Sequence, residues 1–209
     1  MFRFKSTNIP YHFQVRILEN KEFRSIKSEI RVLGVDDGKF VPHTFGRVLV
    51  VGAVIRGNYG LDGVMHTDIA LDGFDAAEQI AEMINNSSHC RQLRLVMLNG
   101  ITFGGFNVVD IKELNIATRI PVIALMRNKP DLEAIRNALN NLPKSDERWK
   151  MILSAGPIID VDSGDKKLYM EIAGISKVDA RKIVVLTATR SLIPEPLRVA
   201  HLIASGITS

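Results

Sequence analysis

The chain has 209 residues, of which 46% are hydrophobic and 24% are charged. This balance excludes disordered and low-complexity proteins and is typical of a globular domain with a sizeable core. The formal net charge of +4 at pH 7 permits a phosphate-bearing partner without requiring one. We therefore expect one domain over residues 1–209, with residues 1–28 as an N-terminal extension or extra strand.

The apolar segments and the cysteine content indicate a cytoplasmic protein. The first residues lack the apolar region of a signal peptide, and no later apolar run approaches the ~20 residues that span a bilayer. Cys90 is the only cysteine, which excludes an intramolecular disulfide and a zinc site built from thiolates of one chain. A metal ion must therefore be bound by oxygen or imidazole ligands.

The first predicted elements of secondary structure come from short segments that are rich in β-branched residues. Residues 30–36, 47–56 and 61–73 are such segments bounded by Gly, Pro or Asp, and they predict three consecutive strands joined as hairpins or a meander. Residues 75–84 carry apolar side chains at helical spacing and predict a helix with Asp75 as its N-cap.

From residue 93 onwards, strands and helices alternate. The pattern predicts strands at 93–98 and 120–126 and helices near 106–117 and at 131–140. Strands that are separated by helices imply parallel neighbours joined by right-handed crossovers.

The last part of the chain continues this mixture. Residues 148–155 and 167–173 are possible strands, and residues 176–189 and 195–206 are expected helices. The chain thus begins with three antiparallel strands and continues with alternating strands and helices. This order predicts an α/β fold with a mixed sheet of the ribonuclease H-like kind, in which three antiparallel strands are followed by parallel strands with flanking helices. A doubly wound, Rossmann-like sheet would instead alternate from its start.

Two adjacent aspartates stand where the first predicted strand ends. Because side chains alternate along a strand, Asp36 and Asp37 point to opposite sides, and only one of them can face a given site. An isolated Asp-Asp-Gly usually closes a turn. A metal role for these residues therefore requires other oxygen ligands to converge on the same place.

Further oxygen ligands follow the other predicted strands. Asp72 and Asp75 lie between the third strand and the first helix, and Asn99 ends the strand that is expected beside the first one. Hard cations bind such oxygens, and two-metal phosphoryl chemistry needs several of them. The competing interpretation makes Asp72 a turn residue and Asp75 a helix cap. Spacing alone does not choose between the two.

A glycine-rich segment, NGITFGGFNVVD, follows the fourth predicted strand. The amides of Gly100, Gly104 and Gly105 are candidates for binding a substrate phosphate near a helix N-terminus. The spacing matches neither the Walker pattern nor the dinucleotide fingerprint. Phe103 and Phe106 suit either base stacking or the core.

Two more residues are candidates of lower rank. Asp110 is expected on the helix after the glycine-rich segment. His201 lies on a helix whose entry is fixed by Pro194 and Pro196, with Arg198 one turn earlier. A lone helical histidine is usually a surface or hydrogen-bonded residue.

Several of these motifs together resemble one family. GVDDG, DGFDA, NGITFGGFNVVDI, PVIALMRNKPD and IPEPLRVAH occur in the order found in endonuclease dU, a largely archaeal family related to endonuclease V, and the match begins at about residue 29. The resemblance implies one endonuclease V-like domain with a ribonuclease H-like fold. It also implies hydrolysis of phosphodiester bonds in DNA or RNA at deaminated bases, with Mg²⁺ or Mn²⁺ as the cofactor.

The resemblance assigns the acidic positions. Asp36 falls on the first catalytic aspartate of endonuclease V and is the leading metal ligand, while Asp75 or Asp72 falls on the second carboxylate. Asn99 stands where endonuclease V carries an aspartate, and its amide oxygen can bind a cation but brings no charge. Metal binding is then weaker, unless another acid such as Asp110 or Asp37 supplies the charge.

The resemblance assigns two basic residues as well. Arg127 takes the place of a lysine and keeps a positive charge for the substrate phosphate. His201 matches a histidine that some relatives carry near the metal, where it positions water or binds a second ion. The Pro-Tyr wedge with which endonuclease V reads its lesion is not recognisable, so hypoxanthine specificity is not implied.

The preferred function is a metal-dependent endonuclease. One alternative is a catalytically silent nucleic-acid-binding module of the same fold, which Asn99 suggests. The other is a hydrolase of a small nucleotide, which requires a pocket too narrow for a strand of nucleic acid.

Overall fold

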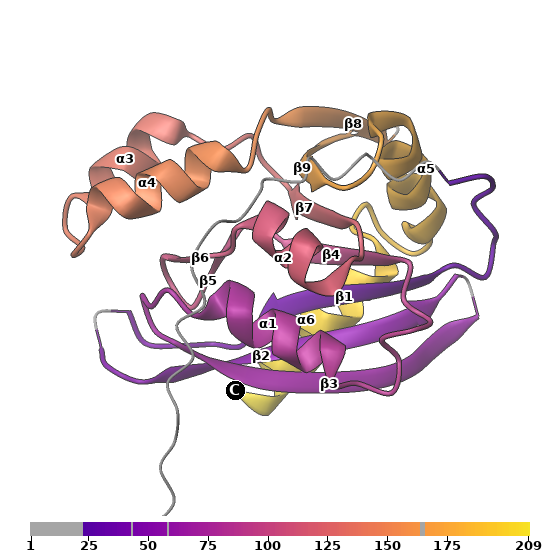
Figure 1. Ribbon diagram of the computed structural model, residues 1–209, viewed down its shortest axis with the longest axis horizontal. Helices are drawn as coiled ribbons and strands as arrows, with labels where there is room; N and C mark the ends of the chain where they lie inside the picture. Colours follow the sequence, from indigo (N-terminus) through magenta and orange to yellow (C-terminus); the bar gives the residue numbers. More distant parts are fainter. Residues whose placement is uncertain (1–22, 43, 58, 164–165) are drawn as a thin grey trace, which may run out of the picture.

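The protein is built on a mixed seven-stranded sheet that lies between two layers of helices (Figure 1). A computed structural model describes residues 23–42, 44–57, 59–163 and 166–209. The possible strand or arm FQVRILEN, at residues 13–20, lies outside the described residues. None of the described helices is long and apolar enough to cross a membrane.

The elements follow one another in this order along the chain. The strands are β1 (Arg31–Asp37), β2 (Arg47–Arg56), β3 (Gly60–Ala70), β4 (Leu95–Asn99), β5 (Thr102–Phe103), β6 (Asn107–Val108), β7 (Val122–Met126), β8 (Ile159–Ser163) and β9 (Lys166–Ala173). The helices are α1 (Ala76–Asn85), α2 (Ile111–Thr118), α3 (Leu132–Leu139), α4 (Ser145–Ser154), α5 (Lys177–Thr187) and α6 (Glu195–Ile207).

The strand order in the large sheet is β3-β2-β1-β4-β7-β9-β8. β1 and β3 are both antiparallel to β2, whereas β1, β4 and β7 run parallel to one another. β9 returns antiparallel to β7 and pairs with β8. The prediction of three antiparallel strands followed by parallel ones is confirmed. This order brings the carboxyl ends of β1, β4 and β7 to one edge of the sheet.

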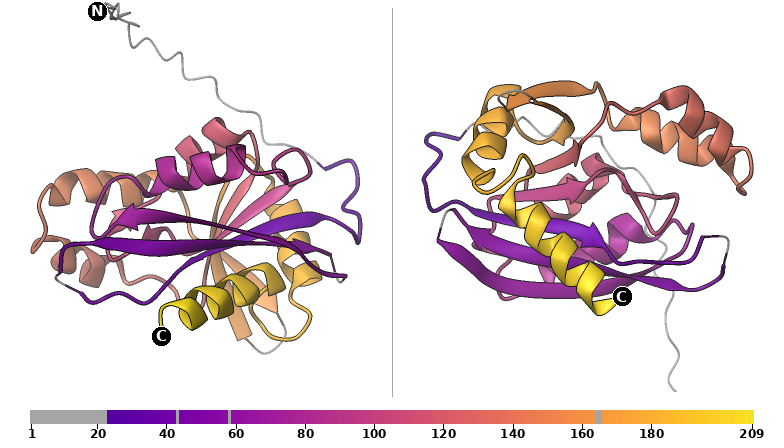
Figure 2. Two further views of the ribbon diagram at one scale, coloured as in Figure 1. Left: turned by 90° about the horizontal axis from the view of Figure 1, so that it is seen from below. Right: turned by 180° about the vertical axis from the view of Figure 1, so that it is seen from behind.

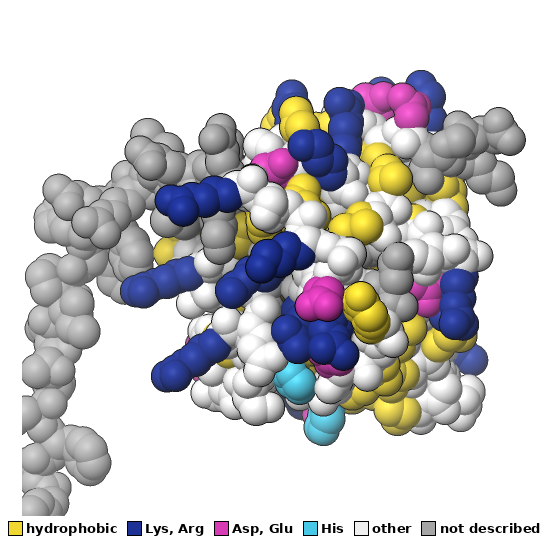
Figure 3. Space-filling view, turned by 90° about the vertical axis from the view of Figure 1, so that its right-hand side faces the viewer, with side chains coloured by type: hydrophobic (Ala, Val, Ile, Leu, Met, Phe, Trp, Pro, Cys, Tyr) yellow, Lys and Arg dark blue, Asp and Glu magenta, His cyan; other side chains and the backbone are white. Residues whose placement is uncertain are grey.

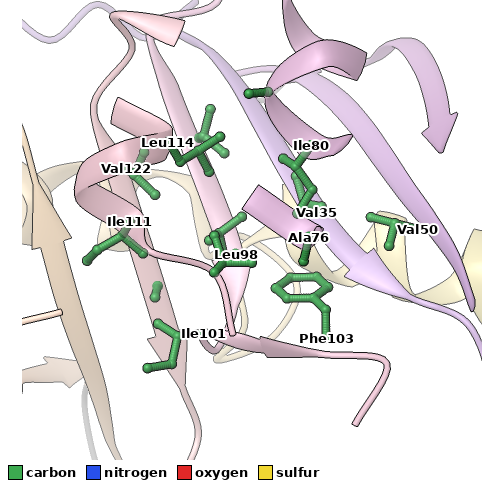
Figure 4. Packing of buried hydrophobic residues seen from close by; sticks show 14 of the residues in the cluster. Val35, Val50, Ala76, Ile80, Leu98, Ile101, Phe103, Ile111, Leu114 and Val122 are labelled. Atoms are coloured by element: carbon green, nitrogen blue, oxygen red, sulfur yellow. The ribbon is translucent and has the colours of Figure 1, made fainter. Parts of the chain in front are cut away.

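Two apolar cores join the helices to the sheet. α1 and α2 cover one face, with α3 and α4 beside them, and α5 and α6 cover the other face (Figures 1 and 2). Phe103 belongs to the first core, where it lies close to Ala76 of α1 (Figure 4). Its side chain is 1% exposed, so it is not available for stacking on a base. Phe106 packs partly against the same core.

Three local predictions differ from the structure. Residues 148–155, a possible strand, lie largely within α4, where Arg148 and Ile152 are buried one turn apart. The helix predicted near 106–117 begins only at Ile111, because β5 and β6 pair as a small hairpin before it. β8 was not predicted, because its sequence, IDVDS, holds only two apolar residues.

The carboxyl half of β1 lies directly under α6. A Cβ atom at Gly34 would come within 2.1 Å of the carbonyl group of Pro196. The start of the helix therefore packs where the strand has no side chain. Pro196 also lies in the first turn of α6, where its fixed φ suits the helix.

We expect Gly34→Ala to lower the free energy of unfolding by about 1–3 kcal/mol, because the added methyl group must push α6 away from the sheet. Urea unfolding measures this change. Gly46→Ala is the matched control, since a Cβ there would meet no atom within 4 Å. Equal stability of the two variants would contradict the close packing of α6 on β1.

Candidate functional site

Asp36 is the centre of a polar cluster at the end of β1. The residue is 2% exposed. Its Oδ2 lies 2.8 Å from Nδ1 of His201, and its Oδ1 accepts a hydrogen bond from Nδ2 of Asn99 at 3.0 Å. The backbone amide of Asp37 also donates to Oδ1, at 3.0 Å. β1, β4 and α6 thus bring these side chains together, as the sequence predicted for Asp36 and Asn99.

α6 packs on one face of the carboxyl half of β1. Gly34, Asp36 and Gly38 alternate along the chain and share this face. A Cβ at Gly38 would lie 2.6 Å from the side chain of Thr208, just beyond α6, and the amide of Lys39 donates to the Thr208 hydroxyl at 2.8 Å. The packing holds the imidazole of His201 over the Asp36 carboxylate while 54% of the histidine side chain stays exposed.

Asp37 points to the other side of the sheet edge, as strand alternation predicts. Its Oδ2 accepts a hydrogen bond from the amide of Gly104 at 2.7 Å. Burial raises the pKa of Asp37 from 3.8 to about 6, and the negative charge of Asp36 adds to this increase, although the Gly104 bond opposes it. Through the hydrogen bond from Gly104, Asp37 anchors the glycine-rich segment to the end of β1.

Asp72 binds the same segment. Its Oδ1 accepts a hydrogen bond from the amide of Phe106 at 2.8 Å. A Cβ at Gly105 would approach this oxygen to 2.3 Å, and Gly105 has a φ of +82°; both features favour glycine there. The amides of Gly104 and Phe106 thus bind the protein's own carboxylates, so of the expected phosphate donors Gly104 is not free. The amide of Gly100 is also occupied, because it donates to the carbonyl oxygen of Leu125 at 2.9 Å, although the space beside its Cα is open.

Asp75 is held in a separate network. It stands at the N-cap position of α1, as predicted, but its side chain makes no capping hydrogen bond. It accepts instead from the amide of Ala70 at 3.0 Å and from Nδ2 of Asn107 at 2.7 Å. The Asn107 oxygen takes over the cap, because it accepts from the amide of Ala76 at 3.0 Å.

The proposed ligands are therefore divided among three sets of contacts. Asp36 shares its contacts with Asn99 and His201, whereas Asp72 and Asp75 are bound elsewhere. Among the described residues there is no group of three His, Cys, Asp or Glu side chains arranged to hold a metal ion. Asp110, the alternative acid, caps α2 by accepting from the amide of Lys112 at 2.8 Å.

Arg148 is a structural residue that sequence reasoning missed. It is 1% exposed, and its guanidinium donates to the carbonyl oxygens of Asp72, Gly73 and Phe106. It also lies 4.0 Å from the ring centroid of Phe74. Burial lowers the pKa of its guanidinium group. Arg148 thereby joins the turn that carries Asp72 to the glycine-rich segment.

A basic groove of about 870 Å³ borders the site. Its cationic lining residues are Arg127, Lys129, Lys167 and Arg198, and Tyr169 lies among them. Arg127 directly follows β7, whose Leu125 is in register with Asn99 of β4. Arg198 lies one turn before His201 on α6. The groove thus adjoins the polar cluster through both β7 and α6.

A second group of basic side chains lies at the amino ends of the parallel strands. A pocket of about 450 Å³ is lined there by Lys27, Arg31, Arg91 and Arg94, together with Glu29. Figure 3 views the molecule from this side and shows several Lys and Arg side chains with fewer acidic ones. Arg31 opens β1 whereas Asp36 lies near its end, so this pocket and the polar cluster are at opposite ends of the strand.

The sequence comparisons point to one family. The family model described as endonuclease dU matches residues 28–208. A UPF0215 protein from Methanothermobacter thermautotrophicus is 53% identical over 192 residues, which cover 91% of this chain and 94% of the relative. A UPF0215 protein from Pyrococcus horikoshii is 39% identical over 186 residues, covering 88% and 95%.

Solved structures show the same fold. The crystal structure of a protein of unknown function from Archaeoglobus fulgidus has a TM-score of 0.77 and 38% identity, covering 85% of this chain and 98% of that one. Human endonuclease V has a TM-score of 0.58 and 14% identity, covering 90% of each chain. Endonuclease V of Ciona intestinalis, in complex with a DNA containing an inosine followed by a ribo-adenosine, has a TM-score of 0.57 and 14% identity, covering 88% and 87%. The predicted ribonuclease H-like fold of the endonuclease V kind is confirmed.

We expect Arg148→Met to lower the free energy of unfolding by more than about 2 kcal/mol, because several buried carbonyl groups lose their donor. Thermal or urea unfolding measures the loss. Lys150→Met changes an exposed residue of the same helix in the same way and is the control. If both variants were as stable as the parent protein, Arg148 would not hold the two segments together.

Glu171 of β9 yields a prediction about pH. It is 5% exposed, and burial raises its pKa from 4.5 to about 7. Folding therefore favours the protonated side chain, and this stability is complete below pH 4.5 and is lost as pH rises through 7. Between pH 4.5 and 7, the free energy of unfolding of the parent protein should fall by up to about 3 kcal/mol relative to that of Glu171→Gln. Unfolding at several pH values measures the difference, and a pH-independent difference would contradict the raised pKa.

Proposed function

Since the chain belongs to the endonuclease dU family, we propose that it is an endonuclease that hydrolyses phosphodiester bonds in DNA or RNA with Mg²⁺ or Mn²⁺. The observation that supports the proposal is the position of the Asp36 carboxylate. It is buried at the carboxyl end of β1, and it binds side chains that lie 63 and 165 residues away in the sequence. A buried carboxyl group that binds side chains from two other elements, close to a basic groove, is a candidate for a reactive centre.

The polar cluster fits an ion that protein and substrate hold jointly. Mg²⁺ commonly binds through one or two carboxylates and takes its remaining ligands from water and substrate phosphates. Asp36 offers the carboxylate and Asn99 the amide oxygen, since its nitrogen is the atom that faces Asp36. A bound ion would stabilise charge on the phosphate and lower the pKa of a water molecule.

His201 is suited to take a proton from the attacking water. Its Nδ1 faces Asp36, and a carboxylate in this position fixes the orientation and tautomer of an imidazole. The second ring nitrogen, Nε2, is then free to accept a proton on the exposed side of the ring. In this role Asp36 orients His201 as well as offering a metal ligand.

The basic groove is suited to hold the nucleic acid on one side of the reactive centre. Arg127, Lys129 and Lys167 supply positive charge for phosphates, and none of the described residues that line the groove is acidic. Tyr169 presents an aromatic ring on which a base can stack. Binding through such contacts weakens steeply as salt concentration rises.

The relatives support an expectation about the base near the cleaved bond. The family is described as endonuclease dU, and the Ciona intestinalis endonuclease V was solved with a DNA that contains inosine. We therefore expect cleavage close to a deaminated base, either uracil or hypoxanthine.

The test is cleavage of end-labelled DNA and RNA oligonucleotides that carry one uracil, one hypoxanthine or no modified base, with Mg²⁺ or Mn²⁺. We expect Asp36→Asn to reduce kcat/KM by at least about 100-fold, because it removes the only charged ligand of the cluster and the partner of His201. His201→Ala should cost about 10²–10⁴-fold, which is typical of a lost general base. Asp68→Asn makes the same change at an exposed position of β3 and should be neutral.

Other results would identify a different function. Equal cleavage by the parent protein and Asp36→Asn would overturn the proposed centre. Salt-dependent binding without cleavage in Mg²⁺ or Mn²⁺ would instead support the silent nucleic-acid-binding module. The observation in favour of that alternative is that the described residues contain no group of three metal-binding side chains.

A further inference from the structure

A smaller cavity lies at the same end of the sheet as the polar cluster, on the face that α3 and α4 cover. Its volume is about 120 Å³, and its walls include Ile101, Leu132, Ile135 and Ile152, with Gly100 and Glu171. Gly100 directly follows Asn99, the residue that binds Asp36. The cavity therefore begins one residue away from the proposed reactive centre. α3 and α4 contribute the apolar side chains of its outer wall.

Glu171 is unusual in these surroundings. The residue is 5% exposed, and its Oε2 has no hydrogen-bond partner among the described residues. A buried carboxyl group without a partner is costly and rare, and it calls for an explanation such as a missing ligand. Its raised pKa, about 7, means that the carboxyl group is about half protonated at pH 7 and largely protonated below it. A protonated carboxyl group both donates and accepts a hydrogen bond.

The size and lining of the cavity fit one planar ring. An apolar protein cavity of about 150 Å³ is known to hold a benzene ring, so 120 Å³ suits a single six-membered ring better than a fused pair of rings. The space beside Gly100 is open, since a Cβ there would meet no atom within 4 Å. A flat group can therefore pass the backbone at this point.

We propose that this cavity, the Glu171 pocket, receives a pyrimidine base turned out of the nucleic acid, and that Glu171 hydrogen-bonds to its Watson–Crick edge. The proposal rests on the proposed function and deepens it. Enzymes that act on bases commonly read a flipped base by hydrogen bonds to this edge and by apolar contacts to its faces. A carboxyl group pairs with the N–H and the adjacent C=O of uracil in two hydrogen bonds, with Ile101, Ile135 and Ile152 available for the apolar contacts.

Binding without cleavage tests the pocket. Fluorescein-labelled single strands that carry uracil, hypoxanthine or an abasic analogue at one central position are titrated with the protein in Ca²⁺, and anisotropy reports the affinity. We expect the parent protein to bind the uracil strand at least about tenfold more tightly than the abasic strand. Glu171→Leu should abolish this preference and keep the affinity for the abasic strand. Glu171→Gln, which retains a donor and an acceptor, should largely preserve the preference.

Two further variants show whether a lost preference for uracil comes from the pocket itself or from altered folding. Ile135→Phe narrows the cavity and leaves Glu171 in place, so it should also remove the preference for uracil. Glu133→Leu makes the test substitution on the exposed side of α3 and should behave as the parent protein does. A preference for uracil that survives both Glu171→Leu and Ile135→Phe would overturn the proposal.

The remaining outcomes separate this inference from the proposed function. Cleavage in Mn²⁺ without any difference in affinity between uracil and abasic strands would overturn the pocket and leave the nuclease standing. A uracil preference that depends on Glu171, without cleavage in Mn²⁺ or Mg²⁺, would overturn the nuclease and leave the pocket standing. Tighter binding of hypoxanthine than of uracil would overturn the assignment to a single ring.

Discussion

The contact between one face of β1 and α6 is the constraint on which the candidate site depends. Gly34 lets the start of the helix approach the strand backbone, and Thr208 secures the chain beyond the other end of α6 through Gly38 and Lys39. Asp36 lies between these two attachments, so His201 is presented to it by a helix fixed on both sides. A buried carboxylate can keep its charge only when such partners surround it.

On the opposite face of the same strand end, acidic side chains bind the backbone of the glycine-rich segment. Strand alternation turns Asp37 away from α6 and toward Gly104, while Asp72 binds the amide of Phe106 in the same segment. Arg148 fastens this segment to the turn that carries Asp72. Two of the acidic residues near the sheet edge thus shape a loop, and this loop leads from the reactive centre toward the Glu171 pocket.

The sequence contained enough to place Asp36 and Asn99 together, because both end strands that the pattern identified as neighbours. It did not contain the contacts of Asp72 and Asp75, since these depend on where the folded hairpin β5 and β6 places the amide of Phe106 and the side chain of Asn107. Arg148 lay in a segment read as a possible strand, so its helical burial was hidden. Glu171 looked like any polar residue of a strand, because only the tertiary fold shows which strand residues are enclosed.

The distance in sequence between Asp36 and His201, 165 residues, has a consequence for how the protein folds. The return of α6 to β1 closes a longer stretch of chain than the pairing of the parallel strands does, and contacts that close a longer loop form later. The sheet and its first core can therefore assemble before His201 docks. Activity should consequently appear later during refolding than the regular secondary structure, with the docking of α6 as the step that separates the two.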